Sequence, residues 1–584
     1  MSGRDIPRRH LAFTRLLYLS VMPATADDPR PSRPRVSRRQ VLAAGGTGLL
    51  AATASTTRAA ARTRKARAAG SDGTPEQIHL TWGENPATSV VVSWASPGPA
   101  TRPRVRIGQR VILAEPRQYT DGINGETVWT YHARVGGLRP GATYAYVVTA
   151  DNDANADDPF TATFRTAPHG RAAFRFTSFG DLATPNTAWV LSYGQSAYAV
   201  DAVESFQPLF HLLNGDLCYA DLNPTAQPAV WRDFGNNNQT SAANRPWMPC
   251  PGNHEVEFDN GPQGFTSYLT RYTLPDNHVP GFGGRWYSFR IGSVLFVSLD
   301  ADDVVYQDAG AFVTGPAALA PVASTGHPAI GAGTSFYIRG YSGGAQTAWL
   351  EYTLAVGRDD PSVDWIIVQM HQCACSSSAT GNGSDLGIRQ QWLPLFDRYQ
   401  VDLVLTGHDH DYERSFPVRG ADADAGHEVA TGAAVNTLRP HPVTTSDSGV
   451  FDTSRGTVHL TLGCGGTDAP LDEYGTDGQR EAKVFTQANR PVPTAAPDVF
   501  TRAAADAVED AVWSAKRDTL TGYGIAVFDV HPDRADFGGQ TGITVTQYHA
   551  VGADPVNPAT GAKGAPIPDY TEFETFTLVR PRQG

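Results

Sequence analysis

Two histidines follow a predicted buried strand at alternate positions. Residues 401–405 (VDLVL) have the apolar composition of a buried strand, and Gly407-His408-Asp409-His410 comes shortly after them. Side chains two positions apart on an extended chain point to the same side, so His408 and His410 can reach one object. A lone histidine is usually a packed core residue, but a pair that converges in this way indicates a bound metal ion.

Four more predicted strands end in residues of the kinds that bind metals. These strands are residues 174–179, 206–213, 247–250 and 365–370. Taken singly, each polar residue after them has an ordinary explanation, such as a helix cap, a turn or a packed imidazole. Seven such residues at five strand ends are better explained by one shared site, and they are Asp181, Asp216, Tyr219, Asn253, His371, His408 and His410.

The donor atoms of this set decide what chemistry it can support. They are oxygen and imidazole nitrogen atoms without thiolates, which favours Fe, Mn or Zn. Seven side chains exceed the needs of one ion, whereas two ions that share a carboxylate would use all of them. A metal pair about 3.5–4 Å apart can hold a phosphate ester and activate water for attack. The residues therefore predict a two-metal site that hydrolyses phosphate esters.

The elements that must position these residues follow one pattern from residue 172 onward. Apolar strands alternate with helical segments, which are predicted at residues 187–204, 345–355 and 388–399. Later strands are predicted at residues 457–462, 525–530, 543–548 and 573–579. In open α/β sheets, ligands bind at the carboxyl ends of the strands, where the predicted metal-binding residues lie. Residues 302–345, 415–455 and 466–520, rich in Gly, Ala, Asp and Thr, are predicted to be long loops.

The preceding region has a different pattern, that of a small all-β domain. Residues 78–94 contain two β-rich runs around a turn at Glu84-Asn85-Pro86, and further strands are predicted at residues 127–135, 143–150 and 161–166. Short strands at this spacing are typical of a β-sandwich of about 100 residues. This region offers no chemistry of its own.

Composition and charge limit the possible partners. A chain of 584 residues that is 41% hydrophobic and 18% charged can bury large cores and should form more than one domain. Residues 1–70 hold 14 of the 47 Lys and Arg and 3 of the 59 Asp and Glu, which leaves the rest with a net charge of -23. An acidic surface of this kind repels nucleic acid, so polyanion binding through a basic patch is not expected.

The basic N-terminus resembles an export signal. Ser37-Arg38-Arg39-Gln40-Val41-Leu42 leads into an apolar stretch at residues 41–54, which is too short to span a bilayer. An arginine pair directly before such a stretch is typical of twin-arginine signals. Residues 1–70 are therefore predicted to be a signal and linker recognised by the twin-arginine export machinery, and the protein is predicted to be secreted without a transmembrane segment.

The five cysteines are too few for a disulfide framework. They stand at positions 218, 250, 373, 375 and 464, with no CxxC spacing. Buried thiols or a single disulfide that pins a loop are expected. Cys218 and Cys250, both beside predicted metal loops, are predicted to lie close enough to form that disulfide.

Five ordered motifs resemble those of the calcineurin-like metallophosphoesterases. They are GDLA (180–183), GDLCY (215–219), GNHE (252–255), VQMH (368–371) and GHDHDYER (407–414). Tyr219 in the second motif and the segment HLTWGENPATSVVVSW (79–94) narrow the resemblance to the purple acid phosphatases. The resemblance implies an α+β and α/β multidomain fold. A fibronectin III-like β-sandwich at residues 75–168 would precede an α/β/β/α layered metallophosphoesterase domain at residues 172–582.

The resemblance also implies roles for individual residues. In this family Asp181, Tyr219 and His410 would bind Fe(III), and Asp216 would bridge to a divalent Fe, Zn or Mn ion. Asn253, His371 and His408 would bind that second ion. Asn253 and His254 would contact the substrate, with His254 as the catalytic residue that helps the leaving group depart. The implied activity is hydrolysis of small phosphate monoesters by attack of a metal-bound hydroxide.

One departure from the family pattern keeps other functions open. Family members carry a further histidine about nine residues after the histidine of the fourth motif, whereas residues 371–380 read HQCACSSSAT. Gln372, Ser376, His278 or His327 could take its place. A phosphodiesterase or nucleotidase with the same metals is therefore an alternative. An exported binding protein with a degenerate metal domain is a third reading, but the complete set of seven ligands argues against it.

Overall fold

The computed structural model describes most of the chain after residue 71. The described residues are 72–257, 259–261, 263–307, 311–312, 336–337, 339–469, 480–487, 490–491, 500–501, 507–534, 538–550 and 570–583. The predicted export signal and His327 lie outside these ranges. Among the described residues, no helix has the length and apolar character needed to cross a membrane.

The N-terminal domain is a β-sandwich, as the strand spacing predicts. One sheet has the order β1 (Glu76–Trp82), β2 (Val90–Ser96), β6 (Thr127–Val135) and β5 (Glu115–Thr120). The other has the order β4 (Arg110–Leu113), β3 (Arg104–Ile107), β7 (Thr143–Thr149) and β8 (Phe160–Arg165). Alternate residues of both sheets form the core, which includes Trp94, Tyr131, Tyr146 and Phe164.

Two seven-stranded mixed sheets form the centre of the following domain. The first runs β11 (Trp247–Cys250), β10 (Phe210–Asn214), β9 (Phe174–Phe179), β31 (Gly524–Arg534), β32 (Gln540–His549), β33 (Glu572–Arg580) and β24 (Val450–Asp452). The second runs β12 (Tyr287–Ile291), β13 (Val294–Ser298), β16 (Trp365–Gln369), β18 (Leu403–Thr406), β25 (Val458–Leu462), β19 (Tyr412–Ser415) and β30 (Ser514–Arg517).

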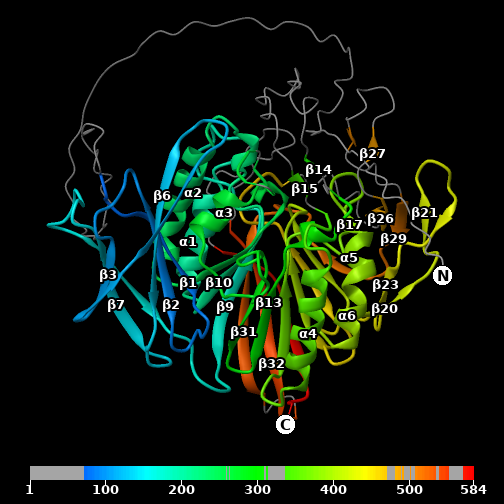
Figure 1. The fold of residues 1–584 in the computed structure, drawn as a ribbon. Coiled ribbons are helices and arrows are strands. Elements are labelled where there is room, and N and C mark those ends of the chain that lie inside the picture. Colours follow the sequence, from blue (N-terminus) through cyan, green and yellow to red (C-terminus); the bar gives the residue numbers. More distant parts are fainter. Residues whose placement is uncertain are drawn as a thin grey trace, which may run out of the picture. The chain divides into compact units, whose positions relative to one another are not determined.

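The two sheets pack face to face and carry helices on their outer sides. Phe176 of the first sheet lies edge-on to Phe296 of the second, with ring centroids 5.3 Å apart, so the main core fills the space between the sheets. A second core joins Leu350 and Trp392 of the outer helices to Ile366 of the second sheet. Figure 1 shows α1 (Ser196–Phe206) and α2 (Gln227–Ala242) to one side, and α4 (Ala345–Asp359), α5 (Leu386–Gln391) and α6 (Leu393–Arg398) to the other. The predicted α/β/β/α layering is confirmed.

Several helix boundaries differ from those predicted. The helix predicted over 187–204 begins only at Ser196, because Leu191 and Gly194 have positive φ values of 59° and 77°. The helix predicted over 388–399 breaks at Trp392, where Pro394 lacks the N–H that would continue the hydrogen-bond ladder. Helix α2 was not predicted, because its sequence is rich in asparagine and has no strong apolar stripe.

All three predicted long loops contain short strands, including β14 (Ala311–Phe312) and β15 (Phe336–Tyr337) in the first of them. A five-stranded sheet has the order β17 (Ser384–Asp385), β26 (Glu481–Phe485), β29 (Ala507–Asp510), β21 (Gly426–Glu428) and β22 (Ala434–Val435). The buried ion pair between Arg389 of α5 and Glu509 of β29, 2.8 Å long, joins this sheet to helix α5. Strands of two to five residues carry too few alternations to be recognised from sequence.

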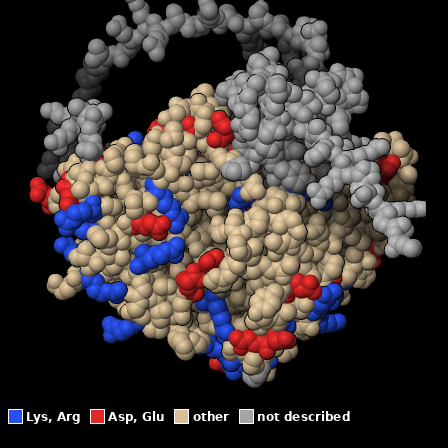
Figure 2. All heavy atoms as spheres, viewed as in Figure 1, with Lys and Arg blue, Asp and Glu red and all other residues tan. Residues whose placement is uncertain are grey.

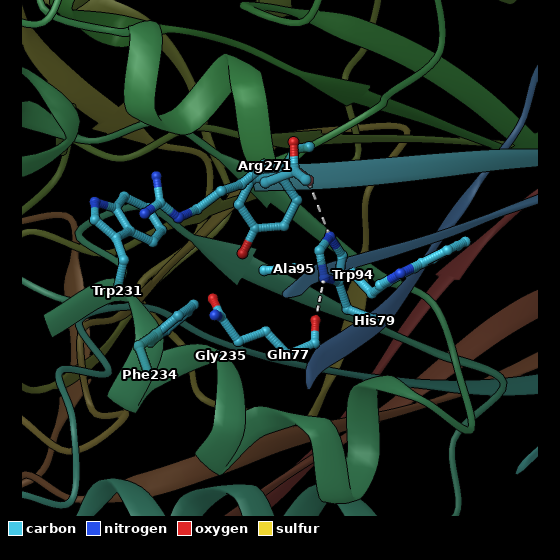
Figure 3. Close-up of a pocket in the computed structure, with 10 residues that line it drawn as sticks. Gln77, His79, Trp94, Ala95, Trp231, Phe234, Gly235 and Arg271 are labelled. Atoms are coloured by element: carbon cyan, nitrogen blue, oxygen red, sulfur yellow. Dashed lines mark hydrogen bonds between the residues drawn. The ribbon is translucent and has the colours of Figure 1, made fainter. Parts of the chain in front are cut away.

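The sandwich contacts the following domain through α2 and α3 (Thr266–Arg271). At this seam His79 contacts the backbone oxygens of Gln77 at 2.9 Å and of Arg271 at 3.2 Å, as the dashed lines in Figure 3 mark. The Arg271 guanidinium lies 4.7 Å from the ring of Trp231. Gly235 of α2 has no side chain, and a Cβ there would lie 2.7 Å from Cγ of Gln77. The seam is therefore tightly packed around a small aromatic-lined pocket (Figure 3).

The surface carries side chains of both charges. On the face shown in Figure 2, Lys and Arg side chains are interspersed with Asp and Glu. Arg104, for example, pairs with Asp151 at 2.6 Å.

All five cysteines are buried and free, so the predicted disulfide between Cys218 and Cys250 is wrong. Thiols with no access to solvent act as small apolar core residues.

Candidate metal centre

The predicted metal-binding residues gather where parallel strands from both sheets end. Strands β9, β10 and β11 run parallel in one sheet, and β16 and β18 run parallel in the other. Carboxyl ends of parallel strands lie at the same edge of a sheet. The loops after these five strands carry the seven residues singled out from the sequence, namely Asp181, Asp216, Tyr219, Asn253, His371, His408 and His410.

Three of these side chains meet at one point. The Tyr219 hydroxyl lies 3.0 Å from Asp181 Oδ1 and 3.1 Å from His410 Nε2. The third side of this triangle, from His410 Nε2 to Asp181 Oδ1, is 3.3 Å long. Asp181 and Tyr219 are fully buried. We call Asp181, Tyr219 and His410 the tyrosine cluster.

A second group of side chains lies beside the tyrosine cluster. His371 Nε2 is 2.9 Å from Asp216 Oδ2 and 3.3 Å from His408 Nδ1. Ligand atoms of Asp216, His371 and His408 all lie within 4.8 Å of one another, and all three residues are buried. We call these three residues the histidine cluster. Asn253 Oδ1 is buried with no hydrogen-bond partner in the described part of the chain, which is costly for an amide oxygen and fits a metal ligand.

Backbone hydrogen bonds join the two clusters. The His408 N–H donates to Asp181 Oδ2 at 3.0 Å, so a residue of the histidine cluster holds a carboxylate of the tyrosine cluster. The N–H of His254, next to Asn253, donates to Asp216 Oδ1 at 2.9 Å. The structure thus brings all the residues predicted to bind metal into one connected region.

The backbone at these positions is strained. Asp181, Asp216, Tyr219 and His408 have positive φ values of 57°, 49°, 58° and 71°. Non-glycine residues rarely adopt this region, and each such residue costs about 1–3 kcal/mol. Four strained positions in one site indicate that the fold tolerates a local loss of stability, because this backbone directs the four side chains toward each other.

Mutual electrostatics hold the clusters together. Burial disfavours a charged imidazole, but the carboxylates of Asp216 and Asp181 outweigh it and raise the pKa of His371 to about 10. Burial, followed by the charges of Asp181 and Asp216, raises the pKa of Tyr219 well above its usual value. These raised pKa values mean that His371 and Tyr219 carry protons on atoms that could bind a cation. Binding a cation there would release these protons.

His254 has a partner that sequence reasoning missed. Its Nδ1 lies 2.9 Å from Oδ2 of Asp221 and 3.0 Å from Oδ1, while its Nε2 lies 3.9 Å from Asp216 Oδ2. Asp221 fixes the ring so that Nε2 faces the metal-binding side. The only signal in the sequence is that Asp221 stands two residues after Tyr219, the last residue of the second motif.

Two other supporting carboxylates hold ligands in place. Glu255 accepts hydrogen bonds from the backbone N–H groups of Asp216, Leu217 and Gly252 at 2.7–2.9 Å, and so shapes the second and third motifs. Asp468 Oδ1 lies 2.8 Å from His410 Nδ1. Asp468 was also missed, because it falls in a segment predicted to be a loop.

Three of the proposed replacements for the missing histidine have other partners. Gln372 donates through Nε2 to Asp302 Oδ1 at 2.5 Å, and Ser376 donates to Glu413 at 3.2 Å. The His278 side chain is 81% exposed and pairs with Asp276. Gln372 remains beside the centre because it directly follows His371, whereas Ser376 supports the fifth motif.

Comparison with known proteins identifies the family. Residues 75–166 match the purple acid phosphatase N-terminal domain, and residues 174–412 match the calcineurin-like phosphoesterase family. An uncharacterised protein of Mycobacterium tuberculosis is 40% identical over 527 residues, covering 87% of each chain. Purple acid phosphatase 21 of Arabidopsis thaliana is 28% identical over 53% of this chain and 61% of its own.

Further matches agree with this result. Phosphoenolpyruvate phosphatase of Allium cepa is 24% identical over 71% of this chain and 74% of its own. The solved structure of purple acid phosphatase PPD1 from yellow lupin has the same fold, with a TM-score of 0.56 over 87% of this chain and 75% of that one, at 17% identity. The chain therefore belongs to the purple acid phosphatase-like metallophosphoesterases and is a hydrolase of phosphoric ester bonds.

Proposed function

We propose that the protein is a secreted phosphatase that holds two metal ions and hydrolyses small phosphate monoesters. The observation that carries this proposal is the pair of adjacent donor clusters, with Asp216 Oδ2 2.9 Å from His371 on one side and the triangle of Asp181, Tyr219 and His410 on the other. Two separate convergences of oxygen and nitrogen donors suit two ions better than one.

The donor types suggest which ion belongs where. A phenolate is a hard anionic donor, so the tyrosine cluster suits Fe(III). Asn253, His371 and His408 provide neutral donors, which suit a divalent Fe, Zn or Mn ion, and Asp216 would serve both ions. When bound, such a pair supplies a nucleophile derived from water and neutralises charge on the phosphoryl group.

The protein's own residues bind and orient the ester. His254 Nε2 lies 3.9 Å from Asp216 Oδ2, so His254 and the neighbouring Asn253 would contact a phosphoryl group held beside Asp216. The carboxylate of Asp221 accepts from His254 Nδ1 and so stabilises the imidazolium form, which leaves Nε2–H to donate to a phosphoryl oxygen or to the departing oxygen. Glu255 keeps the Asp216 loop in place throughout, because it binds three backbone N–H groups.

Secretion is proposed from the N-terminal sequence alone. The arginine pair at positions 38 and 39 before a short apolar stretch supports export by the twin-arginine machinery. That route carries folded proteins, which suits a chain whose metal ligands come from distant parts of the sequence. Small phosphate esters are the proposed substrates, in keeping with the named phosphatases among its relatives.

A phosphodiesterase acting through the same residues is the second candidate. It is favoured by the segment after His371, where Ser376 and the Ser377 N–H bind Glu413 and no histidine is present in residues 372–380. A phosphomonoester carries one more negative charge than a diester, so a site with fewer cationic donors discriminates less against the diester.

Metal analysis and kinetics on matched substrates test the proposal. The purified protein should contain two metal ions per chain, and kcat/KM for a chromogenic phosphate monoester should exceed that for the matching diester across acid to alkaline pH. A preference for the diester would shift the assignment to phosphodiesterase. Hydrolysis of neither substrate by protein that contains both metals would refute both candidates.

A further inference from the structure

The segment after strand β25 contacts both ends of the tyrosine cluster. This segment, residues 463–468 (GCGGTD), is none of the five motifs that carry the metal-binding residues. The Gly465 N–H donates to the backbone oxygen of Gly180 at 2.9 Å, and the Thr467 N–H donates to that of Asp181 at 3.1 Å. The Asp468 carboxylate then reaches His410 Nδ1 at 2.8 Å. One short peptide therefore contacts Asp181 from the first motif and His410 from the fifth.

The glycines of this segment permit that close approach. A Cβ on Gly463 would lie 3.0 Å from Asp181 Oδ2, and a Cβ on Gly465 would lie 2.9 Å from Cδ2 of Phe179. Gly466 has a φ of 153°, and a Cβ there would lie 2.6 Å from the backbone nitrogen of Ser196. At these three positions a side chain would collide with the first motif, the fifth motif or helix α1, which explains the glycines of the segment.

Contacts on both sides fix the Asp468 side chain. Thr467 Oγ1 donates to the backbone oxygen of Leu191 at 3.0 Å and also lies 3.3 Å from Asp468 Oδ1. The side chains of Asp468 and His410 are 24% and 13% exposed, so water competes only weakly for their hydrogen bond. Asp468 accepts from Nδ1, and this leaves Nε2 of His410 directed at Tyr219 and Asp181.

We propose that Asp468 is the positioning residue of the tyrosine cluster, which selects the Nδ1–H tautomer of His410 and directs Nε2 at the ion held there. This inference rests on the proposed two-metal function. Carboxylates that bind the outer nitrogen of a metal-ligating histidine fix its tautomer and orientation, and their loss typically costs about 10-fold to 100-fold in metal affinity or activity. Asp468 would touch neither substrate nor metal and would act only through His410.

Metal retention under a chelator challenge tests the role of Asp468. The holoprotein, Asp468→Asn and a control variant are dialysed against increasing chelator, and metal per chain is measured by elemental analysis. Asp468→Asn should lose one of its two ions at about 10-fold to 100-fold lower chelator concentration. The control is Asp422→Asn, whose carboxylate in strand β20 (Val418–Asp422) pairs with His441 Nδ1 in strand β23 (Arg439–Pro442) at 3.0 Å and which should retain both ions.

The His410→Ala variant tests whether Asp468 acts through His410 or supports the fold in another way. In His410→Ala, the Asp468→Asn change should cause no additional metal loss or drop in Tm, since its effect passes through the absent imidazole. Equal retention by Asp468→Asn and wild type would overturn the inference, as would additive losses in the His410→Ala background. If the wild-type protein bound no metal, the proposed two-metal function would be refuted, and this inference with it.

Discussion

At the scale of single residues, the site depends on carboxylates that hold histidines in one orientation. Asp221 contacts His254 Nδ1 at 2.9 Å, and Asp468 contacts His410 Nδ1 at 2.8 Å. In both pairs the outer nitrogen is bound, so the inner nitrogen is directed at the metal-binding side. Each pair joins residues from separate segments of the chain. The chemistry of His254 and His410 is therefore set by partners that their own motifs do not reveal.

The pair of Asp221 and His254 gives a direct prediction. Asp221→Asn keeps the size of the side chain but removes the charge that stabilises the imidazolium form of His254. If His254 donates a proton to the leaving group, kcat for a substrate with a poor leaving group should fall by a factor on the order of 10². A substrate with a good leaving group should be affected less, because its departure needs little protonation.

A matched pair provides the control for this prediction. Asp276 Oδ2 lies 3.4 Å from Nδ1 of the exposed His278, and both residues lie outside the five motifs. Asp276→Asn should leave kcat and KM for both substrates unchanged. Equal losses on good and poor leaving groups in Asp221→Asn would contradict the role of His254 in leaving-group departure and point to substrate binding alone.

These pairs also mark the limit of sequence reasoning at the residue scale. The predicted metal-binding residues could be found because each follows a recognisable apolar strand, and strand ends must meet at one edge of a parallel sheet. Asp468 follows strand β25 in the same way, but three glycines and a long acidic and alanine-rich segment surround it. Which carboxylate reaches which imidazole depends on loop paths, and local patterns do not encode these.

At the scale of elements, short loops between strands and helices leave no room for side chains. Gly252 precedes Asn253 in the third motif. A Cβ at this position would lie 2.6 Å from the backbone nitrogen of Asp216 and 2.8 Å from Cδ2 of His371. Carbon atoms essentially never come this close, so the loop or the ligands would have to move.

Gly252→Ala is therefore expected to displace Asp216 and His371 from each other. We expect this variant to lose bound metal and to lower kcat/KM by at least 10-fold, because misplacement by about 1 Å can cost 10²-fold in rate. Gly136→Ala is the control, since a Cβ there meets nothing within 4 Å. Metal content and kcat/KM are measured for both variants. If Gly252→Ala matched the wild type in both, the loop would not be close-packed on Asp216 and His371.

The elements also show how far the sequence predicts the fold. Strands β9 and β11 were predicted to the residue, because Phe174–Phe179 has phenylalanine at three of its six positions, Trp247–Cys250 is apolar, and polar or glycine-rich turns follow both. The short strands β21, β22 and β29 were not, since two to four residues of mixed polarity give no usable period. Their stability comes from tertiary contacts such as the ion pair between Arg389 and Glu509.

At the scale of the whole molecule, several buried histidines make the fold sensitive to acid. Burial lowers the pKa values of His79, His132, His211 and His459, reaching about 3 for His132 and for His459. These imidazoles are neutral in the folded protein but take up protons near pH 6.5 when the chain unfolds. Acid therefore favours the unfolded state, and any activity at low pH would depend on stabilisation from other sources, such as bound metal.

His132 offers a test of this acid sensitivity at the seam between the two domains. Its Nδ1 lies 2.8 Å from Ser93 Oγ and its Nε2 lies 3.0 Å from the backbone oxygen of Thr270 in α3. Burial and then the charge of Arg117 lower its pKa to about 3. Between pH 3 and 6.5 the unfolded state binds more protons, so stability rises with pH across this window and is lost as the pH falls. The contribution at stake is on the order of 5 kcal/mol.

His132→Gln removes the titrating group while an amide N–H can still donate to Thr270. Near pH 8 the variant is expected to have a lower Tm than wild type, because the glutamine packs less well. Between pH 7 and pH 4 its Tm should fall less steeply than that of wild type, since the unfolded chain no longer gains a proton at this position. Replacement of the exposed His169 by glutamine should leave the wild-type slope unchanged. Parallel Tm curves for His132→Gln and wild type would show that the seam histidine does not set the acid limit of the fold.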